Sequence, residues 1–119
     1  MVTRLLEYKT RFTDPADVLT ILPWIPTGWL TASAGVKDVP GLVGGIIMRE
    51  EDNDGDQVIK IWDSEDSATT DDVEIARVYG TGVAGNIVTL MFPLPGVEAE
   101  KGIYVELSAG DAEFELYYR

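Results

Sequence analysis

Apolar and polar side chains alternate along the last eighteen residues of the chain, 102–119. The apolar positions come in two runs, Ile103, Val105 and Leu107 and then Phe114, Leu116 and Tyr118. A period of two residues is typical of a β-strand that buries one face and exposes the other. Because a short turn at 109–111 separates the runs, we interpret them as an antiparallel hairpin that ties the end of the chain into a sheet. A hairpin is marginal alone, so other strands must cover its apolar face.

Five further segments have the length and the apolar content of short strands, and turn residues separate them. They are residues 18–22, 42–49, 57–62, 73–79 and 86–92. The acidic turn 50–56 joins two of them, which predicts a second hairpin. The run 86–92 is almost continuously apolar, which indicates a strand buried on both faces. Gly44 and Gly45 interrupt another strand and indicate a bulge or a close approach of the backbone to a neighbour.

The chain shows no 3.6-residue period of useful length, so we expect little or no helix. Seven or eight short strands of this kind predict an all-β fold, an antiparallel β-sandwich, and a jelly roll is the closure that we expect. The length of 119 residues predicts one domain, 1–119. At its start, residues 1–12 place Arg4, Lys9 and Arg11 among apolar side chains. Two interpretations remain open for this segment, a charged edge strand and an extended arm that reaches a neighbouring subunit.

The chain contains no cysteine and no histidine. The missing cysteine excludes disulfides and cysteine nucleophiles, and the missing histidine removes the commonest general base and transition-metal ligand. A net charge of −12 opposes binding to nucleic acid and to anionic membranes. No stretch approaches the roughly 20 apolar residues that span a bilayer, and no signal peptide is evident, so we expect synthesis in the cytoplasm. We therefore expect a non-enzymatic protein without a cofactor, and a protein as its partner.

Residues 52–63 are the nearest match to a metal site, because acidic side chains occupy positions one, three, five and twelve of a calcium loop. Gln57 stands where that loop needs a glycine. We therefore interpret the acidic stretch as a solvated turn, with loose cation binding as the alternative. Paired carboxylates can also hydrolyse glycosides, but we expect Glu106, Glu113 and Glu115 to share one solvated sheet face instead.

Residues 23–30 contain two tryptophans and two prolines. Prolines at this spacing exclude a helix interior and a central strand, so we expect an extended corner or loop. Two interpretations of Trp24 and Trp29 are open. They cap the open end of the sandwich core, or they form an exposed aromatic anchor for a protein or sugar partner.

The C-terminal two-thirds of the chain contains a succession of short motifs. A glycine-containing apolar strand and an acidic turn come first, and residues 58–63 and a Ser/Thr-rich loop follow them. After these come a strand that ends at Tyr79, the dipeptide Phe92-Pro93, the strand 101–107 and the final Tyr117-Tyr118-Arg119. This order resembles a group of small structural proteins of tailed bacteriophages. The resemblance implies a jelly-roll-like virion component without catalytic activity, in the first place a capsid decoration or cement protein, and otherwise a tail, neck or fibre component.

A decoration protein of this kind binds the outer surface of the phage head and bridges major capsid subunits. The acidity of the chain agrees with that position, since packaged DNA would repel it. We expect a homo-oligomer, a dimer or a trimer, that contacts the capsid through the N-terminal arm and the tryptophan corner. The expected contact residues are Arg4, Leu6, Tyr8, Arg11, Trp24 and Trp29. The alternative from another class is a carbohydrate-binding module in which Trp24, Trp29 or Trp62 stacks on sugar rings.

Overall fold

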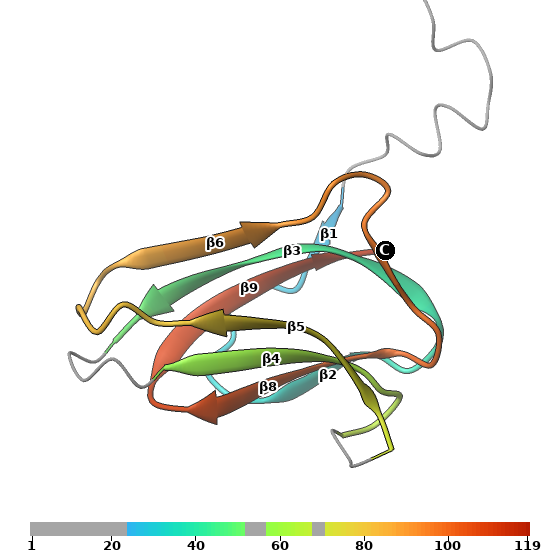
Figure 1. Ribbon diagram of the computed structural model, residues 1–119, viewed down its shortest axis with the longest axis horizontal. Helices are drawn as coiled ribbons and strands as arrows, with labels where there is room; N and C mark the ends of the chain where they lie inside the picture. Colours follow the sequence, from blue (N-terminus) through green and yellow to red (C-terminus); the bar gives the residue numbers. More distant parts are fainter. Residues whose placement is uncertain (1–23, 52–56, 68–70) are drawn as a thin grey trace, which may run out of the picture.

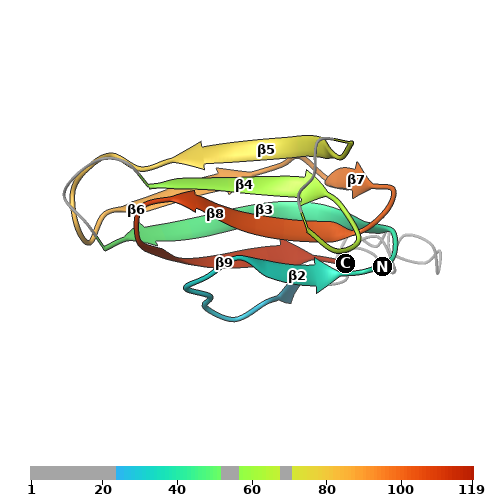
Figure 2. The same ribbon diagram turned by 90° about the horizontal axis from the view of Figure 1, so that it is seen from below.

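The computed structural model describes residues 24–51, 57–67 and 71–119. This part of the chain contains nine β-strands and no helix, and most strands run along the long axis of the molecule (Figures 1 and 2). The strands are β1 (Ile25–Pro26), β2 (Ala34–Lys37), β3 (Gly41–Glu50), β4 (Val58–Asp63), β5 (Val73–Tyr79), β6 (Ile87–Met91), β7 (Val97–Ala99), β8 (Ile103–Ala109) and β9 (Ala112–Tyr118). The predicted all-β fold is confirmed.

The strands form two antiparallel sheets that pack together around one core. The sheet that we call the β3 sheet has the order β1-β9-β3-β6, with β7 also beside β3, and the β4 sheet has the order β2-β8-β4-β5. The pairs are nested along the chain, because β1 pairs with β9, β2 with β8, β3 with β6 and β7, and β4 with β5. Nested pairs folded over into two sheets make a jelly roll, so the predicted sandwich and its closure are confirmed. Since β6 and β7 share one position beside β3, the nine strands fill eight positions.

The two predicted hairpins are wrong, although the faces predicted for the last two strands are right. β8 pairs with β2 and β4, whereas β9 pairs with β1 and β3, so the chain crosses between sheets at 109–111. β3 and β4 also belong to different sheets. Ile103 and Val105 of β8 and Phe114 and Leu116 of β9 are nevertheless fully buried. A period of two residues specifies which face is buried but does not specify the neighbouring strand.

The hydrophobic core lies between the sheets and draws on both. Its buried side chains are Val43, Ile46, Met48, Ile59, Ile61, Val78, Ala99, Ile103, Val105, Ala112, Phe114 and Leu116. Burying a side chain the size of leucine or phenylalanine stabilises the fold by about 1.5–3 kcal/mol. This core fixes the two sheets relative to each other and leaves their outer faces and edges for contacts with other molecules.

β6 is an edge strand, and the prediction that 86–92 is buried on both faces is wrong. Val88 and Leu90 pack against the core, but Ile87 is 63% exposed and Met91 is 54% exposed. Within the described ranges, β3 is the only sheet neighbour of β6. An apolar run therefore does not by itself establish burial of both faces.

Three smaller points compare the predicted strands with the observed ones. The irregularity expected at Gly44 and Gly45 is confirmed, since the register of β3 against β9 shifts between Val43 and Gly45. β2 and β7 were not predicted, because they are short and their sequences lack clear alternation. The strand predicted at 18–22 lies outside the described residues.

Candidate functional site

Trp24 lies against two glycines, whose missing side chains make room for its indole. A Cβ atom added at Gly44 would lie 2.6 Å from Cδ2 of Trp24, and one added at Gly96 would lie 2.8 Å from its Cη2. Neither position accepts a side chain unless the ring or the backbone moves. Gly96 also has a φ of 100°, a conformation that favours glycine. Strand β3 and the turn after β6 thus form a seat for Trp24, which is half-buried there.

The end of β9 completes this seat. The guanidinium carbon of Arg119 lies 5.5 Å from the centroid of the Trp24 ring, within the range of a cation–π contact. The Arg119 backbone continues the ladder to β3, because its N–H donates to the Leu42 carbonyl at 2.9 Å and its carbonyl accepts from the Leu42 N–H at 2.8 Å. Residues 24 and 119 are therefore neighbours, and Figure 1 shows the C-terminus beside β1.

Trp29 belongs to residues 27–30, a segment that backbone hydrogen bonds fasten to β9. Leu30 and Phe114 exchange two such bonds, at 2.7 and 2.9 Å. The Thr27 N–H donates to the Leu116 carbonyl at 2.9 Å, and the Thr27 hydroxyl oxygen accepts from the Leu116 N–H at 3.1 Å. Leu30 packs against the core, whereas Trp29 is 52% exposed. The segment therefore presents an aromatic side chain to solvent from a rigid support.

Trp24 and Trp29, the two predicted contact residues that the structure describes, do not lie in one patch. Trp24 lies beside Arg119, and Trp29 precedes the bridge to Phe114, so about five residues of β9, or roughly 16 Å, separate them. Trp24 is half-buried and Trp29 is exposed. The other four predicted contact residues lie outside the described residues, together with the whole arm 1–12. They are Arg4, Leu6, Tyr8 and Arg11.

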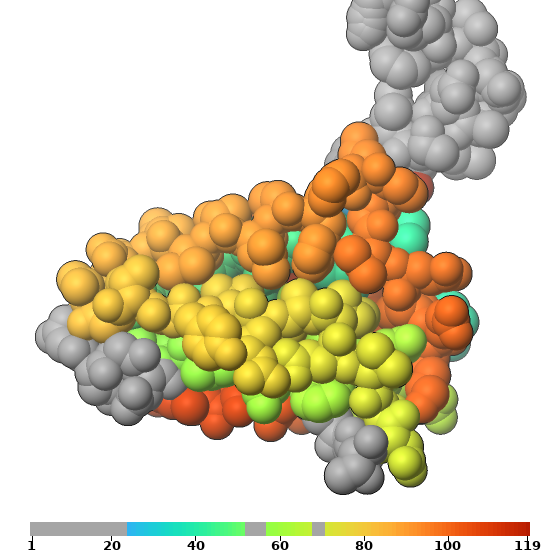
Figure 3. Space-filling model, in the orientation of Figure 1, coloured from blue at the N-terminus to red at the C-terminus, as the bar shows by residue number. Residues whose placement is uncertain are grey.

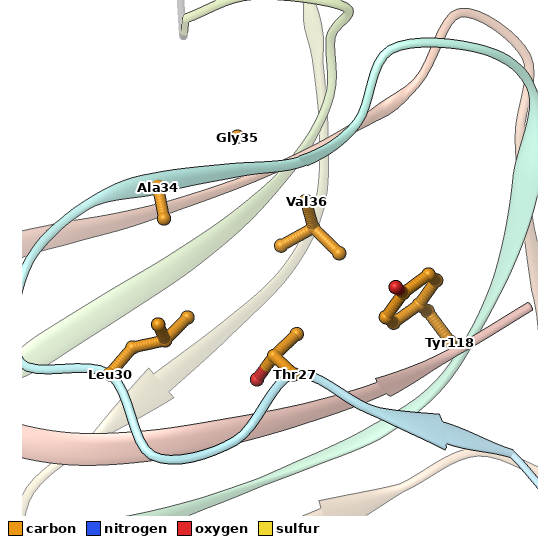
Figure 4. Close-up of a pocket in the computed structure, with 6 residues that line it drawn as sticks. All are labelled: Thr27, Leu30, Ala34, Gly35, Val36 and Tyr118. Carbon is orange, nitrogen blue, oxygen red and sulfur yellow. The ribbon is translucent and has the colours of Figure 1, made fainter.

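A hollow of about 170 Å³ lies between this segment and β2 (Figure 4). Its lining residues are Thr27, Leu30, Ala34, Gly35, Val36 and Tyr118. In Figure 4, Ala34 and Val36 point from β2 toward Leu30 and Thr27 on the facing segment. A second hollow, of about 470 Å³, shares Gly35, Val36 and Tyr118 with the first. The first lining offers two hydroxyl groups and no charged side chain, so it suits an apolar group better than a charged substrate.

Glu50 is a buried carboxylate that the sequence did not reveal. We expected it in the acidic turn, but it is the last residue of β3 and only 1% exposed. Its Oε2 accepts a hydrogen bond from the Thr81 hydroxyl at 2.5 Å, and its Oε1 accepts from the Gly82 N–H at 2.8 Å. Its backbone N–H donates to the Asn86 carbonyl, and its carbonyl accepts from the Gly85 N–H. Glu50 therefore holds the connection between β5 and β6.

The pKa of Glu50 lies below its ordinary value. The hydrogen bond from the Thr81 hydroxyl has the largest effect and lowers this pKa, burial raises it, and backbone N–H groups of residues 81–83 lower it further. The carboxylate is thus ionised at neutral pH, and its oxygens are committed to the loop. These contacts give Glu50 a structural task.

Asp63, the last position of the predicted calcium loop, is committed to another loop. Its carboxylate accepts hydrogen bonds from the backbone N–H groups of Glu100, Lys101 and Gly102 at 3.0, 2.7 and 3.4 Å. Burial alone would raise the pKa of Asp63, but these bonds and the charge of Lys101 bring it below its ordinary value. The turn 52–56 lies outside the described residues. Asp63 therefore serves to fasten the segment between β7 and β8.

The common face expected for Glu106, Glu113 and Glu115 is wrong, since β8 and β9 belong to different sheets. On the β4 sheet, Glu106 accepts a hydrogen bond from the Trp62 indole N–H at 2.9 Å. On the β3 sheet, Glu113 forms an ion pair with Arg49. Glu106 therefore lies on a different sheet from the other two carboxylates. On β9, Glu113 is engaged by Arg49 and Glu115 accepts a hydrogen bond from the Tyr117 hydroxyl at 2.8 Å.

Comparisons of the chain with protein-family models, with curated proteins and with solved structures found no match. In the described ranges, no three acidic side chains come together in a way that could hold a metal ion. The same ranges contain no helix able to cross a membrane.

Proposed function

We propose that this chain is a non-enzymatic virion structural protein, a capsid decoration or cement protein that binds the outer surface of a phage head and bridges major capsid subunits. The observation that carries the proposal is the exposed apolar segment bonded to β9, in which Trp29 is 52% exposed and Ile25 is 50% exposed. Large apolar side chains held on a rigid element are typical anchors of protein interfaces. The phage-protein resemblance of the C-terminal two-thirds supports the same role.

The distribution of charge supports a protein partner for this segment. Of 119 residues, 9 are basic and 21 are acidic, yet residues 18–36 contain no charged side chain. A net charge of −12 disfavours contact with packaged DNA and favours a position outside the shell. The uncharged segment can meet a capsid subunit without bringing carboxylates against it.

Repetition would make such a contact strong enough for a cement function. A surface that includes one exposed tryptophan and a few aliphatic side chains is small beside the roughly 1,600 Å² of a standard interface. A head carries many equivalent positions, and an oligomer that engages two or three of them raises the effective affinity by orders of magnitude. The proposed partner is therefore the major capsid protein, contacted by several copies of this chain at once.

Two experiments test the proposal. Cryo-electron microscopy of the phage particle that carries this chain should show density for the jelly roll on the outer surface of the head. In reconstitution, purified chain is added to heads that lack it, and binding is measured by co-sedimentation. We expect Trp29→Ala to weaken binding at least tenfold. The matched control is Val73→Ala, because Val73 is 65% exposed on β5, away from the segment, and this change should weaken binding less than twofold.

Other outcomes would redirect the proposal. Density in the tail, neck or fibre would replace the capsid role with that position in the virion. Head binding that is the same with and without the Trp29 side chain would show that the aromatic segment is not the contact.

A carbohydrate-binding module is the second candidate, and the outer face of the β4 sheet favours it. Trp62 lies opposite Tyr104 in the register of β4 and β8, and the buried neighbours of both residues direct their side chains outward. Aromatic faces of this kind can stack on sugar rings. Tryptophan fluorescence titrated with a glycan panel separates the candidates, since a saturable change lost in Trp62→Ala would favour a sugar ligand.

A further inference from the structure

β6 differs from the other edge strands in the described part of the chain, because it has no feature that discourages further pairing. It has five residues, no charge, no proline and no register shift against β3. By contrast, β1 is two residues long and contains Pro26, β2 has an irregularity between Gly35 and Lys37, and β7 has three residues. β5 carries an ion pair between Glu74 and Arg77. Natural sheets use such features to prevent association at their edges.

The hydrogen bonds to β3 determine which backbone groups of β6 face away from it. The Glu50 N–H donates to the Asn86 carbonyl, and the Phe92 N–H donates to the Gly44 carbonyl. Residues 86 and 92 therefore face β3, and so do the even-numbered residues between them, because the direction alternates along an antiparallel strand. The backbone groups that face the other way belong to Ile87, Thr89 and Met91. The side chains of the same three residues are exposed on the outer face.

The surface around β6 is apolar and uncharged over an unusual length. The twenty residues 78–97 contain no charged side chain in a chain that is 25% charged. The large apolar side chains of this run that are more than half exposed are Tyr79, Val83, Ile87, Met91 and Leu94. Figure 3 shows β6 running beside β5 across one side of the molecule. Arg49, the nearest charge on the outer face of β3, is neutralised by Glu113.

We propose that β6 pairs antiparallel with β6 of a second copy of this chain, about a two-fold axis at Thr89. In this register Thr89 faces Thr89, and Ile87 faces Met91 of the second copy, so that their outward backbone groups exchange hydrogen bonds. The axis also brings the Val83 end of one copy beside the Leu94 end of the other. The β3 sheet then continues across both copies.

The charge of the chain indicates that the strand paired with β6 belongs to a second copy of the chain. Each copy has a net charge of −12, so contact through most other surfaces would bring carboxylates of the two copies together. Pairing through β6 joins two uncharged strands instead. The inference does not depend on the proposed capsid role, because the isolated chain tests it.

Sedimentation of the purified full chain over a range of concentrations provides the first test, and we expect a monomer–dimer equilibrium. Thr89→Lys places two like charges opposite each other at the axis and should weaken the dimer at least tenfold. Because the Thr89 side chain is exposed, the variant should unfold at the same temperature as the parent chain when both are monomeric. Val73→Lys adds the same charge to an exposed position of edge strand β5 and should change dimerisation less than twofold.

Single cysteines provide the second test, since the chain has none of its own. Cα atoms of a hydrogen-bonded antiparallel pair lie about 5.5 Å apart, within the range that a disulfide spans. Under a mild oxidant, Thr89→Cys should form a covalent dimer. Ile87→Cys should cross-link with Met91→Cys faster than with itself, whereas Val73→Cys should stay monomeric.

Three results would overturn the inference. One is a chain that stays monomeric at the highest concentration reached. Another is a dimer that survives Thr89→Lys, because its interface would then lie elsewhere. The third is cross-linking of Thr89→Cys no faster than that of Val73→Cys, which would exclude the two-fold register even if the chain dimerises.

Discussion

β5 and β6 lie on the same side of the sandwich, one at the edge of each sheet, and they differ in what they present to solvent. Both turn apolar side chains to the core, Val78 from β5 and Leu90 from β6. On its outer side β5 carries Glu74 and Arg77, which form an ion pair, whereas β6 carries no charge. The inner sides of both strands are apolar because they face the core. The outer sides differ, because the ion pair suits β5 to contact with water, whereas the uncharged β6 suits contact with another molecule.

The largest expected effect concerns the side that the two strands share. Val78→Asp should destabilise the fold by about 3 kcal/mol or more, because it buries a charge without a partner. Leu90→Asp should cost less, since Leu90 is only half-buried. Urea unfolding at pH 7 measures both. A Leu90→Asp variant as stable as the parent chain would mean that the core does not hold β6 in the way that it holds β5.

The next effect concerns Glu50, which holds the connection between the two strands. Glu50→Gln keeps the shape but weakens the bonds to Thr81 and Gly82, so the urea midpoint at pH 7 should fall by roughly 0.5–1 M. Because the native state lowers the pKa of Glu50, its ionised form contributes stability above the ordinary pKa, and this contribution is lost as the pH falls through the lowered pKa. The difference between parent and variant should therefore shrink toward pH 3. A difference independent of pH would show that the charge of Glu50 does not matter.

The smallest effect concerns the ion pair that protects β5. The Arg77 hydrogen bond lowers the pKa of Glu74, so the pair contributes above the ordinary pKa of glutamate and is lost in acid. Both side chains are partly exposed, and Glu74→Gln should lower the melting temperature by only about 2 °C in low salt and by less in high salt. Its clearer effect should be on solubility, measured by light scattering. If the Glu74→Gln variant is as soluble as the parent chain, another feature of β5 must prevent association at this edge.

The sequence predicted burial better than it predicted neighbours. The alternation around Ile103 and Phe114 identified their buried faces, and turn residues separated most of the strands correctly. The same pattern fits a hairpin and a crossing between sheets, because the side-chain period is two in both cases. Only packing in three dimensions distinguishes them, and here the apolar faces of β8 and β9 are best buried on opposite walls of the core.

The candidate site shows a similar limit. Gly44 indicated an irregularity or a close approach in β3, but only the structure identifies Trp24 as the side chain that approaches. Glu50 was invisible, since an acidic residue beside an acidic turn gives no sign of the loop some thirty residues later that it binds. Long-range partners of this kind depend on topology, which a single sequence encodes only weakly.

The closeness of Arg119 to Trp24 matters for anyone who labels this protein. A polypeptide joined after Arg119 would begin beside the indole and would crowd the aromatic segment, so a fusion there would hinder the contact that we propose for this segment for steric reasons alone. The turn 109–111 lies at the other end of the long axis, where β8 passes into β9 (Figure 1). A short tag inserted at that turn would keep reporter and aromatic segment far apart.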